Sequence, residues 1–77
     1  MASTELAHMT KNAKERIVFS RSSFNGQDLI DVRVYFEADS GEWLPTRKGI
    51  AMRPELFDEF AETVRRVEGS RGTGGNG

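Results

Sequence analysis

The chain has 77 residues, a formal net charge of −1 and no cysteine, which indicates one small domain and excludes disulfides and thiolate metal sites. Only 36% of the residues are hydrophobic, so a single copy can bury only a thin core, and a partner subunit is the remaining means of stabilising it. No apolar run approaches the ~20 residues of a membrane span, and no basic region followed by a hydrophobic stretch opens the chain. We therefore expect a soluble protein of the cell interior.

Residues 1–13 show no sustained apolar period, so we expect a disordered leader there. The pair His8-Met9 is typical of a cloning junction, which favours a natural start at Met9. His8 is the only histidine and has no cysteine to help it hold zinc. We predict neither a metal site nor a cofactor.

Two alternating segments follow and predict strands at 16–21 and 28–36. Asn25-Gly26 lies in the segment that joins them, and this pair favours the positive φ angles of a two-residue hairpin turn. Asp39-Ser40-Gly41 predicts a second turn.

After that turn, the segment "EWLP" (42–45) predicts a short strand stopped by Pro45. Gly49 then precedes a last strand that carries Ile50 and Met52 and ends at Arg53. The predicted fold is α+β: a meander of four antiparallel strands followed by one C-terminal helix.

The helix is predicted to begin at Pro54, because proline suits the first turn of a helix. Six apolar residues then recur at helical spacing up to Val67, and Gly69 is the predicted stop. The folded domain would span residues 14–68. Residues 69–77 are rich in glycine and lack an apolar anchor, so we expect a flexible tail.

Charge is divided between the predicted elements. Residues 10–53 carry eight basic and six acidic side chains, a net charge of +2, whereas residues 54–68 carry five acidic and two basic ones, a net charge of −3. One surface can therefore be positive although the whole chain is slightly acidic.

Two stretches, "FNGQDLIDVRVYF" (24–36) and "PTRKGIAMRPELFDEF" (45–60), resemble the DNA-binding domain of the transcriptional coactivator positive cofactor four and its bacterial and phage relatives. The resemblance runs from about Lys14 to Val67, and the "RKGI" segment (47–50) is its most specific part. It implies a curved sheet and a helix that dimerise, with single-stranded nucleic acid lying across the sheets.

The resemblance also implies a set of site residues. Aromatics would stack on bases and cations would contact phosphates, which is how sequence-tolerant single-strand binding works. Asn25 and Gln27 occupy first-turn positions where better-known members have lysines, so two phosphate contacts are missing and weaker binding is expected. The predicted nucleic-acid-binding residues are Arg21, Phe24, Asn25, Gln27, Arg33, Phe36, Arg47 and Lys48, and the predicted dimer interface is Leu56, Phe57, Phe60 and Val64.

Several alternatives stay open. Phe24 and Phe36 could be core residues, and Arg47-Lys48 could be a solvated surface pair. Phe36 has the opposite strand parity from Arg33, so both could reach one ligand only if the strand bends or ends near Tyr35. Trp43 could anchor a dimer interface or offer a further stacking surface.

An enzyme is not expected, because Asp28 and Asp31 do not form an acid/base pair and no nucleophile or phosphate-binding glycine loop is present. The predicted function is sequence-tolerant binding of single-stranded DNA, coactivator-like, in transcription, replication or repair, with the corresponding machinery as partners. The alternatives are RNA binding and a dimeric adaptor module that binds protein through a strand edge. The expected location is the cytoplasm, with the nucleoid, in a bacterium and the nucleus in a eukaryote.

Overall fold

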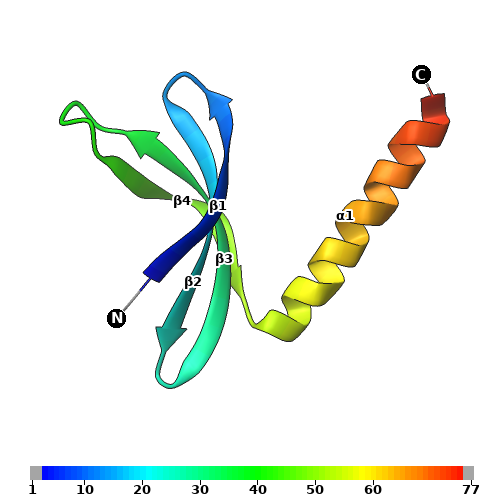
Figure 1. Ribbon diagram of the computed structural model, residues 1–77, viewed down its shortest axis with the longest axis horizontal. Helices are drawn as coiled ribbons and strands as arrows, with labels where there is room; N and C mark the ends of the chain where they lie inside the picture. Colours follow the sequence, from blue (N-terminus) through cyan, green and yellow to red (C-terminus); the bar gives the residue numbers. More distant parts are fainter. Residues whose placement is uncertain (1–2, 76–77) are drawn as a thin grey trace.

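The computed structural model describes residues 3–75, with side chains up to residue 71. It shows one open sheet of four antiparallel strands in the order β1-β2-β3-β4, followed by one helix (Figure 1). The elements are β1 (Ser3–Asn12), β2 (Glu15–Phe24), β3 (Gln27–Glu37), β4 (Trp43–Met52) and α1 (Pro54–Gly75). The predicted fold class, an antiparallel meander followed by a helix, is confirmed.

Strand β1 corrects the prediction of a disordered leader at residues 1–13. Ser3–Asn12 pair with β2 from Ser3↔Ser22 to Asn12↔Glu15. Every side chain of β1 is exposed, so the strand has no buried face and leaves no apolar period in the sequence. The strand forms because its backbone pairs with that of β2. Residues 1 and 2 lie outside the described residues.

The hairpin between β2 and β3 has the predicted turn. Asn25 and Gly26 adopt φ angles of 52° and 76°, as a two-residue turn of this type requires. Pairing then runs from Phe24↔Gln27 to Glu15↔Phe36 without a register shift. The bend near Tyr35 that would bring Phe36 and Arg33 to one face is therefore absent from this ladder.

Strand β4 corrects the prediction of two short strands at 42–45 and 50–53. One strand spans Trp43–Met52, and Pro45 lies inside it, which is tolerated because β4 is an edge strand. The register shifts between Arg33↔Gly49 and Tyr35↔Pro45, so an irregularity rather than a strand end separates the two halves. The count of four strands was right, but β1 supplies one of them.

The strand pairing divides the sheet into two faces. The polar face carries the side chains at positions 16, 18, 20 and 22 of β2 and those paired with them, including Asp31, Arg33 and Tyr35. The apolar face carries Ile17, Phe19, Ile30, Val32, Val34, Phe36, Ile50 and Met52. Among the described side chains, only Val18 and Met52 are buried hydrophobic residues. The core of one copy is therefore small.

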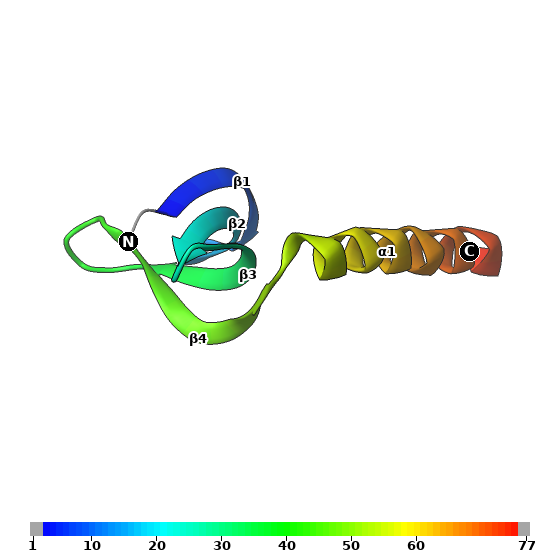
Figure 2. The same cartoon turned by 90° about the horizontal axis from the view of Figure 1, so that it is seen from below.

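Helix α1 begins just after the end of β4 and projects away from the sheet (Figures 1 and 2). A groove of about 300 Å³ between helix and sheet is lined by Phe19 and by Phe57, Phe60, Ala61, Val64 and Arg65. The helix is not long and apolar enough to cross a membrane over its described residues.

The helix does not stop at Gly69 as predicted but continues to Gly75. The prediction of a flexible tail is therefore wrong for residues 69–75. Glycine lowers helix propensity without forbidding the helix. An ion pair one turn apart, Arg71 to Glu68 at 2.7 Å, supports this segment. Residues 76 and 77 lie outside the described residues.

Candidate nucleic-acid interface

The polar face is hollowed into a groove of about 320 Å³ that all four strands line. Ser20 lies in it and is only 4% exposed. Hydroxyl groups, one carboxylate, one guanidinium and one phenol are among the groups that line the groove. The residues that line it are Ser3, Ser20, Ser22, Asp31, Arg33, Tyr35, Pro45 and Ala51.

Arg33, a predicted phosphate ligand, is engaged inside the protein. Its Nε donates to Asp31 Oδ2 at 2.9 Å, and its Nη2 donates to Asp31 Oδ1 at 2.8 Å. These hydrogen bonds raise the pKa of Arg33 above its ordinary value. A third bond runs from Nη1 to the Thr46 carbonyl at 3.0 Å. Charge-assisted forks of this kind are strong and directional.

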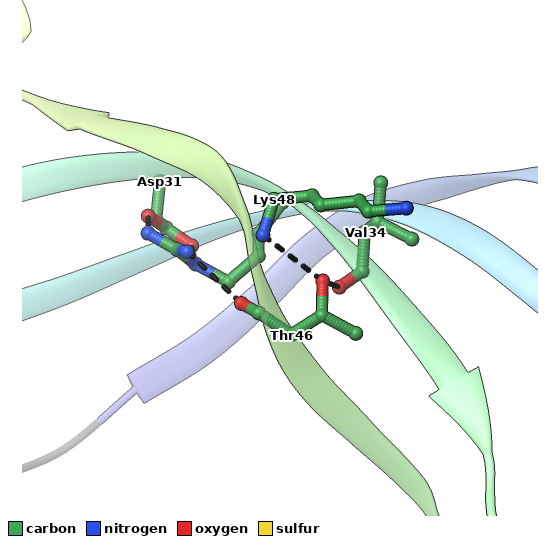
Figure 3. A network of polar contacts seen from close by, with 5 residues as sticks. Asp31, Val34, Thr46 and Lys48 are labelled. Atoms are coloured by element: carbon green, nitrogen blue, oxygen red, sulfur yellow. Dashed lines mark hydrogen bonds and ion pairs between the residues drawn. The ribbon is translucent and has the colours of Figure 1, made fainter.

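The register shift in β4 places three residues, Thr46–Lys48, opposite Val34. Thr46 Oγ1 donates to the Val34 carbonyl at 2.8 Å and accepts the Lys48 amide at 3.1 Å (Figure 3). Arg47 and Lys48 are exposed, and the Lys48 side chain runs away from Asp31 in the close-up (Figure 3). The predicted cation pair therefore lies on a hydrogen-bonded bulge at a sheet edge.

Phe36 lies at one end of the hairpin on the apolar face, directly opposite Glu15 and Leu44, and is 39% exposed. Glu15 accepts a hydrogen bond from Lys11 Nζ at 2.9 Å. This bond is the main cause that lowers the pKa of Glu15, and the nearby charge of Lys48 contributes to it as well. Lys11 and Lys48 thus both act on Glu15, the cross-strand partner of Phe36. The sequence had indicated only Lys48, because Lys11 fell in the expected leader.

The other predicted residues lie at the opposite end of the hairpin. Phe24 is 53% exposed on the polar face, beside the turn that holds Asn25, and pairs with Gln27. Arg21 Nη2 forms an exposed ion pair with Asp28 Oδ2 at 2.9 Å. The structure therefore places the two predicted stacking aromatics at opposite ends and on opposite faces of one hairpin.

One aromatic–cation pair was missed in the sequence. The Arg16 guanidinium lies 3.9 Å from the centroid of the Trp43 ring, and Arg16 pairs with Tyr35 across the strands. Both partners belong to the polar face. With the hairpin turn at Asn25-Gly26, the cross-strand pairing puts Arg16 on the same face as Arg33, and this was the available signal for Arg16. Its contact with Trp43 depends on the path of β4.

Asp28 and Asp31 are each paired with an arginine, Asp28 with Arg21 and Asp31 with Arg33. Within residues 3–75, no group of three or more His, Asp and Glu side chains could hold a metal ion.

Comparison with known proteins gives this geometry a context. The sequence profile of the family described as Transcriptional Coactivator p15 (PC4) matches residues 11–63, more than half of the chain. A PC4 homolog from Burkholderia pseudomallei, in an orthorhombic crystal form, has a TM-score of 0.82 and 30% identity, over 87% of this chain and 90% of that one. Its tetragonal form gives 0.80 and 31%, over 91% of this chain and 100% of that one.

A third solved structure, the bacteriophage T5 homolog of the eukaryotic transcription coactivator PC4, implicated in recombination-dependent DNA replication, shares the fold. Its TM-score is 0.61 at 19% identity, over 88% of this chain and 83% of that one. With the profile match and the Burkholderia structures, the chain belongs to the Transcriptional Coactivator p15 (PC4) family.

Proposed function

We propose that this protein binds single-stranded DNA with little sequence preference and without catalysis. The observation that supports this most directly is the bulge at Thr46–Lys48, which presents two exposed cations, Arg47 and Lys48. The charge of Lys48 acts on Glu15, the cross-strand partner of the exposed Phe36. Cations that follow the phosphate backbone, next to an aromatic surface for the bases, are what single-strand binding requires. Membership of a coactivator family supports the same function.

The proposed role is coactivator-like and lies where single strands are exposed, in transcription, replication or repair. The T5 homolog is implicated in recombination-dependent DNA replication, and the family description names transcription. Both processes expose unpaired bases, whose faces are available for stacking.

We further propose that the active form is a homodimer. The groove of about 350 Å³ between β4 and α1 is lined by Ile50, Met52, Leu56 and Phe60, among others, and Ile50 and Leu56 are more than half exposed. A second copy would cover these side chains. Of the predicted interface residues, Leu56 and Val64 are exposed, whereas Phe57 and Phe60 stack on each other with ring centroids 5.7 Å apart.

Fluorescence anisotropy with a labelled oligonucleotide, as single strand and as duplex, at several salt concentrations tests the proposed function. We expect tighter binding of the single strand, because a duplex hides the base faces. Arg47→Ala with Lys48→Ala should weaken binding about equally for every sequence, and should flatten the slope of log K against log salt by about one unit per lost phosphate contact.

Phe36→Ala is the matched control, since stacking releases no counterions. It should weaken binding by roughly 1–3 kcal/mol with little change in the salt slope. Absence of binding at low salt, or a preference for duplex, would refute the proposed function and favour a protein-binding adaptor that uses the exposed edge strand β1. The same oligonucleotide made as RNA distinguishes the two nucleic acids.

A further inference from the structure

The bulge at Thr46–Lys48 needs a support beyond the sheet ladder. Three residues of β4 oppose the single residue Val34 of β3, so regular ladder hydrogen bonds are interrupted there. Backbone groups that lose their ladder partners must find others or remain solvated and mobile. The position of Arg47 and Lys48 therefore depends on what replaces the ladder.

Two hydrogen bonds of the Thr46 side chain replace part of the missing ladder bonds. Its hydroxyl donates to the Val34 carbonyl at 2.8 Å and accepts the amide of Lys48 at 3.1 Å. These bonds join both sides of the bulge to β3 through a single side chain. They leave the carbonyl of Thr46 for a further donor.

Arg33 supplies that donor. Its Nη1 bonds to the Thr46 carbonyl at 3.0 Å, while Nε and Nη2 form a fork with the two carboxylate oxygens of Asp31. The side chains of Arg33 and Asp31 are only 23% and 16% exposed. Asp31 thus holds the guanidinium in one orientation, aimed at the bulge.

The neighbouring backbone is closely packed at the same place. A Cβ atom at Gly49 would lie 2.6 Å from the Val32 carbonyl oxygen and 2.7 Å from the Cα atom of Arg33. Only glycine allows β4 to approach β3 so closely beside the guanidinium. Arg33 also lies on the opposite face of the sheet from Phe36. The two side chains therefore cannot contact the same ligand on one face of the sheet.

We propose that Arg33 is a positioning residue: held by Asp31, it fixes the bulge that presents Arg47 and Lys48, instead of contacting phosphate itself. The proposal rests on the proposed function for the ligand of Arg47 and Lys48. The order of the bulge, in contrast, can be measured without any ligand.

The first experiment therefore uses the free protein. The heteronuclear ¹⁵N–{¹H} NOE reports picosecond to nanosecond mobility of each amide. In Arg33→Lys, which keeps the charge but loses the fork, we expect the values of Arg47 and Lys48 to fall while those of β2 and the β2–β3 turn stay unchanged. Unchanged values at Arg47 and Lys48 would overturn the proposal.

The second experiment compares two charge-matched variants by oligonucleotide binding. Asp31→Asn and Asp28→Asn each remove one negative charge and the carboxylate partner of one arginine. We expect Asp28→Asn to tighten binding or leave it unchanged, because it frees the exposed Arg21. Asp31→Asn should weaken binding roughly three- to tenfold, as expected when contacting residues are uncoupled. Tighter binding by Asp31→Asn would show that a freed Arg33 contacts phosphate, and would overturn the proposal.

A double-mutant cycle completes the test. Arg33→Lys should weaken binding in the wild-type background and have no effect when Arg47 and Lys48 are already alanine, because Arg33 then has nothing to position. Additive losses would overturn the proposal. If the wild-type protein binds no oligonucleotide, the proposed function fails, while the NOE comparison still decides whether Arg33 orders the bulge. Circular dichroism melting of each variant controls for loss of fold.

Discussion

At the residue scale, Glu15 shows how a single acid is accommodated within a predicted binding surface. It faces Phe36 across the strands and accepts hydrogen bonds from Lys11 Nζ at 2.9 Å and Asn12 Nδ2 at 2.8 Å. These bonds to the charged form, the one from Lys11 first, lower its pKa. A negative charge beside the proposed stacking ring is therefore balanced from within the protein, before any phosphate arrives.

We predict that Glu15 titrates below the ordinary glutamate range, and that Lys11→Met moves its pKa back toward that range. Because the folded-state pKa is lowered, the stabilisation is present above the unfolded-state pKa and is lost as pH falls through the folded-state value. Side-chain carboxyl ¹³C shifts followed by NMR would measure both titrations. A Glu15 pKa that is insensitive to Lys11→Met would contradict this assignment.

At the element scale, β1 is the strand whose stability depends most on its neighbour. It pairs with β2 along its length, and all its side chains are exposed. Its residues Ala7 and Met9 lie opposite Phe19 and Ile17 of the apolar face. Backbone pairing therefore supplies most of the interaction that holds it, together with partial cover of that face.

Deleting residues 1–12 should consequently destabilise the domain, although the sequence pattern alone predicts a dispensable leader. Each backbone hydrogen bond contributes roughly 0.5–1.5 kcal/mol net, so losing a whole strand should lower the free energy of unfolding by several kcal/mol. Urea unfolding followed by circular dichroism measures this change. A matched truncation of the last six residues should have little effect. An unchanged unfolding midpoint without residues 1–12 would mean that β1 adds nothing to stability.

At the scale of the whole molecule, one copy has more apolar surface than core. Val18 and Met52 are the buried hydrophobic residues among the described side chains, whereas Ile50, Leu56, Val64 and Val67 are more than half exposed. Exposed apolar surface of this extent on a small domain favours association with a second copy. The helix that carries three of these residues projects from the sheet (Figure 2).

We expect sedimentation equilibrium at micromolar concentration to give twice the chain mass of 8.6 kDa. Phe60→Asp would place a charge in both grooves beside the helix and should yield monomers or unfolded chain. Arg66→Asp is the control, because Arg66 is exposed and lines neither groove. A folded wild-type monomer of 8.6 kDa would refute the dimer.

The set of site residues stays a prediction, and the structure adds how those residues are arranged. The resemblance named Arg47, Lys48 and Phe36, and in the structure the charge of Lys48 acts on Glu15, the cross-strand partner of Phe36. It places Phe24 at the far end of the hairpin and couples Arg33 to Asp31. Side-chain types follow from sequence, but which of them meet depends on register and on the bulge in β4, which no local pattern encodes.

Local backbone preferences explain what the sequence determined by itself. Asn25-Gly26 favours positive φ, the alternation in 28–36 suits a pleated strand, and Pro54 suits a first helical turn, so these elements form where they were predicted. The tertiary structure alone decided that Ser3–Asn12 form a strand, that β4 continues through Pro45, and that Arg33 points at the bulge. Each of these depends on hydrogen bonds to residues distant in the chain, whose energy appears only once the strands have come together.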